Sequence, residues 1–188
     1  MLRDLVQKSR SYRRYYEDER LTDETLRDLV ALARVSPSTG NSQALRFRLV
    51  STREGCAQVF STLGWAGQLK DWPGPEAGER PAAYILVLVD KEIAQSKDTD
   101  VGIAAQTILL GATELGYGGC MLGNVKREKL LALENIDSER YALPLVIALG
   151  KPKEDVRLVD AVDGDTHYYR DAAGVHYVPK RPLEELLI

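Results

Sequence analysis

Several features that define other classes of protein are scarce or missing in this sequence. Its 188 residues include only two cysteines, Cys56 and Cys120, which are too far apart in the sequence to form a CxxC pair. We therefore expect neither a disulfide framework nor a metal site, and we infer a reducing, cytoplasmic environment. No run of about eighteen apolar residues occurs, so we expect no membrane span. The formal net charge of -3 gives no general attraction for nucleic acid.

The common catalytic motifs are missing as well. There is no GxGxxG after a strand, no GxxxxGK[ST] phosphate loop and no GxSxG turn. The only histidines, His167 and His176, lie in the C-terminal tail without HExxH-type spacing, and we expect surface or hairpin positions for them. Because no nucleophile or acid–base pair stands out, we expect no catalytic side chain. If the chain is an enzyme, a cofactor supplies its chemistry.

Two kinds of hydrophobic pattern alternate along the chain. Helical spacing of apolar residues predicts helices, and alternating or continuous apolar runs predict strands. A hairpin over residues 168–178 is expected to turn at Gly174, and residues 64–80 are expected to form an irregular surface segment that could act as a lid. The predicted helices span residues 2–9, 22–36, 101–115 and 126–133, and the predicted strands span residues 45–50, 82–89 and 144–149.

The organisation of these segments predicts a single domain. We find no internal repeat, no low-complexity segment and no linker that would divide residues 1–188. The predicted helix over 101–115 is apolar on almost all sides, which is typical of a helix buried in a core or in an oligomer interface.

Three polar clusters are candidates for ligand binding. The first, Ser9–Tyr15, contains three arginines, whose planar guanidinium groups suit a phosphate. The second, Pro37–Gln43, follows a helix end and is rich in small donors and amides that could bind the polar edge of a heteroaromatic ring. The third, Lys180–Arg181, would add positive charge if the tail folds back. Each cluster alone could also be an ordinary exposed turn or loop.

Taken in chain order, six short motifs resemble those of the nitroreductase family of flavin mononucleotide (FMN) enzymes. Each motif is weak alone, but their shared order over nearly the whole chain makes the resemblance specific. This sequence departs from the family pattern at Ser9, Ala44 and Leu122. The six motifs are Arg10–Tyr15, Ala33–Gln43, Asp100–Gln106, Gly116–Gly123, Ala148–Pro152 and Arg181–Glu185.

The resemblance implies an α+β fold with a central mixed or antiparallel sheet flanked by helices. It also implies an intertwined homodimer with two FMN sites at the subunit interface, each lined by both subunits. Residues 1–188 would form a single nitroreductase-like domain. Its C-terminal tail, from about residue 165 to residue 188, would complete the cofactor site or the dimer.

The resemblance also implies roles for particular residues. The FMN phosphate and ribityl chain would be held by the N-terminal cluster, joined by the C-terminal pair. The flavin ring would contact the second cluster, partly from the partner subunit, and the end of the Gly-rich motif. Which of the three N-terminal arginines contacts the phosphate stays open. The implied cofactor-binding residues are Arg10, Ser11, Arg13, Pro37, Ser38, Asn41, Gln43, Leu122, Gly123, Lys180 and Arg181.

The function implied by the resemblance is that of an FMN-dependent NAD(P)H oxidoreductase. A hydride from NADH or NADPH would pass through flavin N5, in a ping-pong cycle, to a nitroaromatic, a quinone or a similar small-molecule acceptor. The alternative is an FMN-binding storage or sensor protein with little turnover. That alternative gains support if Trp65 or Trp72 covers the flavin face and blocks nicotinamide stacking.

Overall fold

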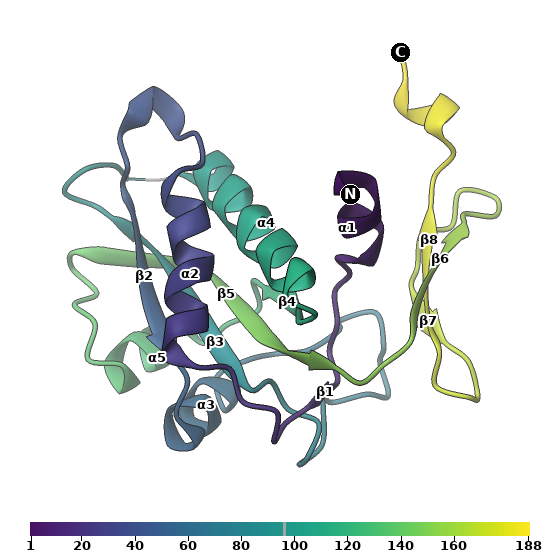
Figure 1. Ribbon diagram of the computed structural model, residues 1–188, viewed down its shortest axis with the longest axis horizontal. Helices are drawn as coiled ribbons and strands as arrows, with labels where there is room; N and C mark the ends of the chain where they lie inside the picture. Colours follow the sequence, from purple (N-terminus) through teal and green to yellow (C-terminus); the bar gives the residue numbers. More distant parts are fainter. Residues whose placement is uncertain (96) are drawn as a thin grey trace.

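An antiparallel β-sheet forms the centre of the structure, and each of its strands pairs with β5 or β3 (Figure 1). The computed structural model describes residues 1–95 and 97–188. The strand order is β1-β5-β3-β2, and β4 also pairs with β5. This arrangement, with helices on the sheet, confirms the expected α+β fold. The strands span Tyr15–Tyr16 (β1), Leu45–Val50 (β2), Ala83–Asp90 (β3), Gly118–Leu122 (β4) and Tyr141–Pro152 (β5).

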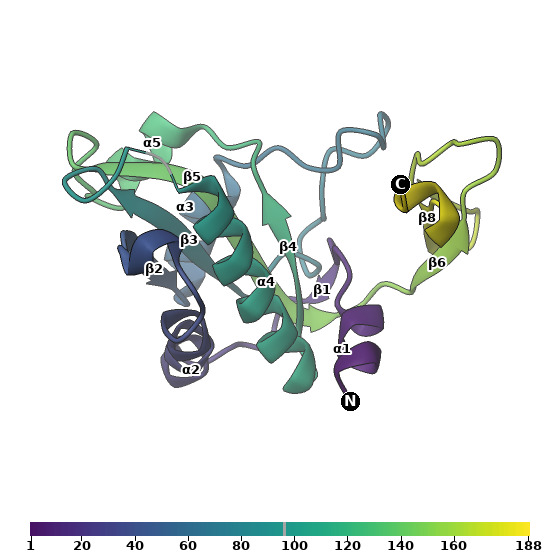
Figure 2. The same cartoon turned by 90° about the horizontal axis from the view of Figure 1, so that it is seen from above.

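The central strand β3 is apolar on both faces. All eight of its residues are buried. Ile85 and Val87 belong to the core on one face of the sheet, with residues of α2 and α4, whereas Tyr84 and Leu86 belong to the core on the other face, with residues of α3 and α5. A strand of this kind needs cover on both faces, which explains why helices lie on both sides of the sheet (Figure 2).

Two of the helices begin at threonine caps. Thr22 Oγ1 accepts the Thr25 N–H, and Thr52 Oγ1 accepts the Gly55 N–H, both at 3.1 Å, which satisfies donors that a helix start leaves unpaired. Among the described residues, none of the helices has the length and apolar character needed to cross a membrane. The helices span Leu2–Lys8 (α1), Asp23–Arg34 (α2), Arg53–Phe60 (α3), Asp98–Glu114 (α4) and Arg127–Leu133 (α5).

The C-terminal part of the chain forms a second, three-stranded sheet of order β6-β8-β7. It comprises β6 (Val156–Asp160), β7 (Tyr169–Arg170) and β8 (His176–Lys180). The expected hairpin is confirmed, because β7 pairs antiparallel with β8 and Gly174 at the turn has φ 82. This sheet stands beyond α1 at the side of the main body, and a 3₁₀ helix, Leu183–Leu186, extends away from it (Figures 1 and 2).

Candidate functional site

The basic stretch expected to bind phosphate lies between α1 and β1, alongside β4. Ser11 forms a parallel bridge with Gly119, and the Tyr12 N–H donates to the Gly119 carbonyl at 3.0 Å. A side chain at Gly119 would bring its Cβ within 2.5 Å of the Ala148 carbonyl oxygen, so the close packing of β4 against β5 at this position requires glycine. Tyr15 is fully buried and fixes the far end of the stretch in the core.

The three arginines of this stretch use their donors differently. Arg14 donates from Nε and Nη2 to both carboxylate oxygens of Glu79, at 2.5 and 2.7 Å. Arg10 donates from Nη2 to the Val6 carbonyl at 2.6 Å. Within the described residues, Nε of Arg10 and Nε of Arg13 are buried without a hydrogen-bond partner. Arg10 and Arg13 therefore keep unused buried donors, whereas Arg14 is engaged in an ion pair.

The Arg14–Glu79 pair predicts an acid-sensitive contribution to stability. The bond from Arg14, assisted by Lys153 Nζ at 3.0 Å, lowers the pKa of Glu79 from 4.5 to about 2. A carboxylate with a depressed pKa stabilises the fold above its ordinary pKa and loses that contribution as the pH falls. We expect wild type to exceed Glu79→Gln in free energy of unfolding at pH 7, and the difference to shrink between pH 4.5 and 2. Urea unfolding of both proteins across this range measures the difference, and a constant difference would contradict the assignment.

The second predicted cluster, residues 37–43, is a tight loop between α2 and β2 with a strained backbone. Gly40, Asn41 and Gln43 have φ values of 60, 51 and 49. These values lie in the left-handed region, which residues other than glycine seldom adopt. The Gln43 amide group contacts Asn41 Oδ1 at 3.3 Å, so the two amides lie side by side. Such strain persists only where neighbouring contacts hold it.

Asp100, in the first turn of α4, supplies those contacts. Its Oδ1 accepts hydrogen bonds from the N–H and from the Oγ1 hydroxyl of Thr39, at 2.9 and 2.7 Å. The carboxylate is only 2% exposed, and the bonds from Thr39 lower the pKa of Asp100 despite the opposing effect of burial. The loop expected to contact the flavin is therefore held on the N-terminal end of α4.

Asp100→Ala should destabilise the protein, because it removes both bonds to Thr39. We expect a loss of about 1.5–3 kcal/mol in the free energy of unfolding, the usual contribution of a hydrogen bond to a charged group. Chemical denaturation measures the change. Asp100→Asn is the matched control, since its side-chain oxygen can still accept from Thr39, and it should lose clearly less stability. Equal losses in the two variants would contradict this role.

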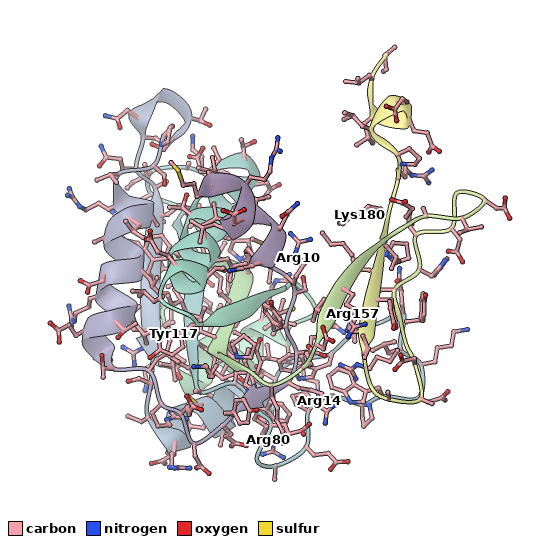
Figure 3. All side chains as sticks on the ribbon, turned by 45° about the vertical axis from the view of Figure 1, so that its right-hand side comes forward. Arg10, Arg14, Arg80, Tyr117, Arg157 and Lys180 are labelled. Atoms are coloured by element: carbon pink, nitrogen blue, oxygen red, sulfur yellow. The ribbon has the colours of Figure 1, made fainter. Side chains whose placement is uncertain are left out.

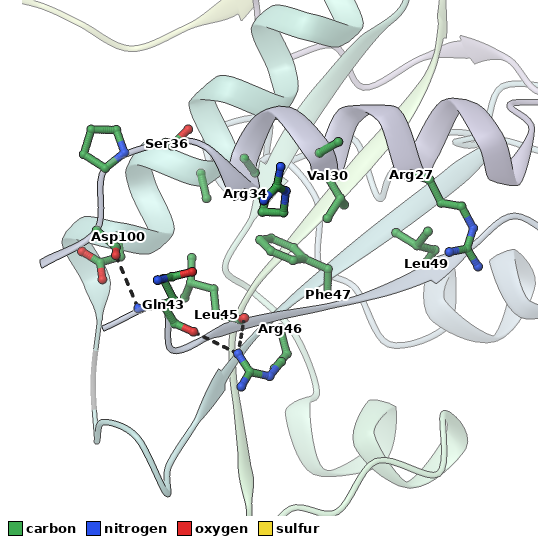
Figure 4. A pocket seen from close by; sticks show the side chains of 15 residues that line it. Arg27, Val30, Arg34, Ser36, Gln43, Leu45, Arg46, Phe47, Leu49 and Asp100 are labelled. Carbon is green, nitrogen blue, oxygen red and sulfur yellow. Dashed lines mark hydrogen bonds between the residues drawn. The ribbon is translucent and has the colours of Figure 1, made fainter. Parts of the chain in front are cut away.

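Beside the loop, a cavity of about 510 Å³ opens between α2 and β2 (Figure 4). Its lining is mostly apolar, with Phe47 and Val30 facing one another across it, and arginines stand at its rim. We call it the α2–β2 groove. The residues that line it are Arg27, Val30, Ala31, Ala33, Arg34, Ser36, Pro37, Ser38, Gln43, Leu45, Arg46, Phe47, Leu49, Asp100 and Ala104.

The structure does not bring the first two clusters together within one chain. The 37–43 loop is bonded to Asp100 at the N-terminal end of α4, whereas Ser11 bridges Gly119, just beyond the C-terminal end of α4. A helix of 17 residues is about 25 Å long. The two clusters accordingly lie at opposite ends of α4 in both views (Figures 1 and 2).

Leu122 and Gly123 lie at the end of β4, on the same side of α4 as the N-terminal stretch. They follow Gly119 by three and four residues, or roughly 10 Å along a strand. Leu122 is buried and Gly123 is exposed. Arg127 fixes this point by donating from Nη2 to the Gly123 carbonyl at 2.9 Å. Leu122 and Gly123 thus follow the β4 residue that Ser11 bridges, further along the same chain segment.

Lys180 and Arg181 lie at the far end of β8, where the C-terminal sheet gives way to the terminal 3₁₀ helix. Arg181 Nη1 pairs with Glu185 at 3.1 Å. Figure 3 shows Lys180 on the C-terminal sheet and Arg10 beside α1. Among the described residues, no hydrogen bond connects this pair to the N-terminal stretch.

The two tryptophans of the 64–80 segment are occupied in packing. Trp65 is 8% exposed and contacts the Phe60 ring, with the centroids 5.8 Å apart. The Arg170 guanidinium lies over the Trp72 ring, 4.2 Å from its centroid. Each indole ring therefore has a packing partner within this chain. Coverage of the flavin by one of these tryptophans was the feature expected to favour a storage or sensor protein.

Sequence reasoning missed two acidic residues that shape the site, Glu79 and Asp100. Asp100 had a detectable signal, because a carboxylate in the first turn of an otherwise apolar helix needs a polar partner when that turn is buried. Glu79 had none, since its partner Arg14 lies 65 residues away and nothing in the local sequence distinguishes Glu79 from the other acidic residues.

Comparison with known proteins adds independent information. The model of the nitroreductase family matches residues 6–151. A protein of Archaeoglobus fulgidus that carries the name NADH dehydrogenase/NAD(P)H nitroreductase is 29% identical over 157 residues, covering 80% of this chain and 85% of that protein.

Solved structures show the same fold. A nitroreductase-type protein of Desulfovibrio desulfuricans, crystallised with FMN, superposes with a TM-score of 0.72 at 26% identity, covering 100% of this chain and 95% of that one. An FMN-dependent nitroreductase of Clostridium difficile has a TM-score of 0.65 at 22% identity and covers 80% of this chain and 87% of its own. Because its identity is only 22%, the similarity to the Clostridium difficile structure supports the fold alone.

Proposed function

The chain belongs to the nitroreductase family, and on that premise we propose that it is an FMN-dependent NAD(P)H oxidoreductase acting as a homodimer. FMN is its cofactor, and NADH or NADPH is its electron donor. A relative carries the name NAD(P)H nitroreductase, and a similar structure holds FMN. The two free, buried cysteines suit a reducing compartment, and we place the protein in the cytoplasm.

The observation that carries the proposal is the pair of unpartnered buried donors, Arg10 Nε and Arg13 Nε. A buried polar group without a partner is costly and is rare in folded proteins. A phosphate monoester carries about −1.5 to −2 charges near pH 7 and offers several acceptor oxygens. It would satisfy both guanidinium groups, with Ser11 between them, so the residues present fit the phosphate of FMN.

When bound, FMN supplies the hydride chemistry at its N5 atom. The contributions of this chain are binding and orientation. Arg10, Ser11 and Arg13 hold the phosphate, while Leu122 and Gly123 at the end of β4 support the ring. We propose that NAD(P)H and the acceptor occupy the same position beside the flavin in turn. This gives a ping-pong cycle that ends on a nitroaromatic, a quinone or a similar acceptor.

The separation of the two clusters supports a dimer. The 37–43 loop lies about one α4 length from the basic stretch of its own chain, about 25 Å. A second chain that packs with its α4 antiparallel would place its loop near this chain's basic stretch. Each FMN site then takes its phosphate contacts from one subunit and loop residues such as Asn41 and Gln43 from the other.

The C-terminal tail is the second support for a dimer. Leu183, Leu186 and Leu187 are 63%, 63% and 68% exposed, which is costly for a free tail. Glu184 and Glu185 lie among them. The α2–β2 groove has the complementary character, with an apolar lining and arginines at its rim. We propose that each tail occupies the groove of the partner and so completes the single domain of 1–188.

Initial-rate kinetics test the proposed activity. Protein saturated with FMN should oxidise NADH or NADPH in the presence of a quinone or a nitroaromatic compound. Double-reciprocal plots at several acceptor concentrations should give parallel lines, as a ping-pong cycle requires. Intersecting lines would contradict the shared position for the two substrates, and oxidation that does not depend on FMN would contradict the proposed function.

A further inference from the structure

Glu154 connects the C-terminal sheet to the basic stretch. It follows β5, just past residue 151, where the family match ends, and its side chain is 0% exposed. Its two oxygens have different partners. Oε1 accepts the main-chain N–H of Arg13, and Oε2 accepts Arg170 Nη2 at 2.8 Å. The carboxylate therefore ties the backbone at Arg13 to the strand β7.

Tyr168 holds the same arginine by its side chain. The Arg13 guanidinium carbon lies 4.8 Å from the centroid of the Tyr168 ring, a cation–π contact. The ring is supported in turn by the His176 ring, with the centroids 5.3 Å apart. The Tyr168 N–H donates to Gln68 Oε1 at 3.0 Å. Backbone and guanidinium of Arg13 are thus both fixed by the segment beyond residue 151.

The groups around Glu154 keep it charged. Burial by itself raises the pKa of Glu154, but His176, the Arg13 N–H and Arg170 outweigh burial and lower it. His176 is fully buried, and its Nδ1 lies 3.7 Å from Oε2, beyond hydrogen-bond range. Among the residues that the structure describes, only Arg170 places a guanidinium within hydrogen-bonding distance of Glu154. A buried carboxylate held in this way makes an inflexible anchor.

We propose that Glu154 and Tyr168 are positioning residues that hold Arg13 with its unused donor directed to a phosphate, and that they make the chain select a phosphorylated flavin over an unphosphorylated one. The inference rests on the proposed function, since it presupposes that Arg13 contacts the FMN phosphate. It goes further by assigning cofactor selection to residues outside the matched family region. Neither residue touches the flavin ring in this account.

The test compares dissociation constants for FMN and for riboflavin, which has the same ring and ribityl chain but no phosphate. Glu154→Ala and Tyr168→Leu should each weaken FMN binding on the order of tenfold, which corresponds to ~1.4 kcal/mol, and leave riboflavin binding unchanged. Two conservative variants serve as controls. Glu154→Gln retains an acceptor for the Arg13 N–H, and Tyr168→Phe retains the ring, so both should keep an FMN-to-riboflavin ratio near that of wild type.

The outcomes separate this inference from the proposed function. A wild-type chain that bound neither flavin would overturn the proposed function and the inference with it. Wild-type FMN binding, with equal losses for FMN and riboflavin in Glu154→Ala and Tyr168→Leu, would show a purely structural role and overturn the inference alone. If Glu154→Ala fails to fold, Tyr168→Leu decides the matter, because Tyr168 is only half-buried whereas the Glu154 side chain is fully buried.

Discussion

Replacing Arg10 and Arg13 together by alanine should weaken FMN binding by about 3–6 kcal/mol, since each charged hydrogen bond contributes roughly 1.5–3 kcal/mol. The dissociation constant would then rise by at least about a hundredfold. The reason is structural, because these are the arginines of the basic stretch whose buried Nε atoms lack a partner. Fluorescence quenching of added FMN measures the change directly.

Arg14→Ala is the matched control. It removes one positive charge from the same stretch, but Arg14 is already paired with Glu79 through two bonds. We therefore expect Arg14→Ala to lower the free energy of unfolding and to leave the FMN affinity of the folded chain close to that of wild type. An equal loss of affinity in this variant, or no loss in the double variant, would contradict the assignment of the phosphate site.

Leu186→Asp combined with Leu187→Asp should dissociate the proposed dimer. Burial of each leucine contributes about 1.5–3 kcal/mol, and each aspartate adds the cost of desolvating a charge in the groove. We expect the dissociation constant of the dimer to rise by at least two orders of magnitude. This corresponds to a loss of about 3–6 kcal/mol in the free energy of dimerisation. Sedimentation velocity over a range of concentrations measures the shift, and the FMN content should fall in parallel.

Val162→Asp provides the control for this prediction. Val162 is 73% exposed, similar to the tail leucines, but it lies in the turn after β6 and not in the tail. We expect Val162→Asp to stay dimeric. If the tail variant remained dimeric with full FMN content, the tail would not occupy the partner's groove, and another surface would have to form the dimer.

The main elements of the fold could be predicted from local patterns. Hydrophobic periodicity located β2, β3 and α4 to within a few residues, because each buries a regular stripe or a complete run of apolar side chains. The helix α3 and the strand β6 were not predicted. The helix is short, and its buried positions Cys56 and Val59 are too few to stand out. In β6, Val156 and Val159 are only partly buried, so their periodicity is weak.

The site was predictable by residue type but not by position. The basic stretch and the 37–43 loop both stood out, yet their placement at opposite ends of α4 depends on the path of the whole chain. Arg14 bonds to Glu79, which is 65 positions away in the sequence, and the Arg13 N–H bonds to Glu154, which is 141 positions away. His176 lies on the expected hairpin, but it is 0% exposed because it packs against Tyr168 and Glu154, which no local pattern indicates.

The claim that this chain is an FMN-dependent NAD(P)H oxidoreductase is tested most directly by anaerobic reduction of the purified, FMN-loaded protein. The account predicts a yellow protein that retains about one FMN per chain and is bleached by NADH or NADPH in the absence of oxygen, with the colour restored by a quinone or a nitroaromatic compound. A yellow protein that neither nicotinamide bleaches would indicate FMN storage or sensing instead. A protein that remains colourless after addition of FMN would contradict the account.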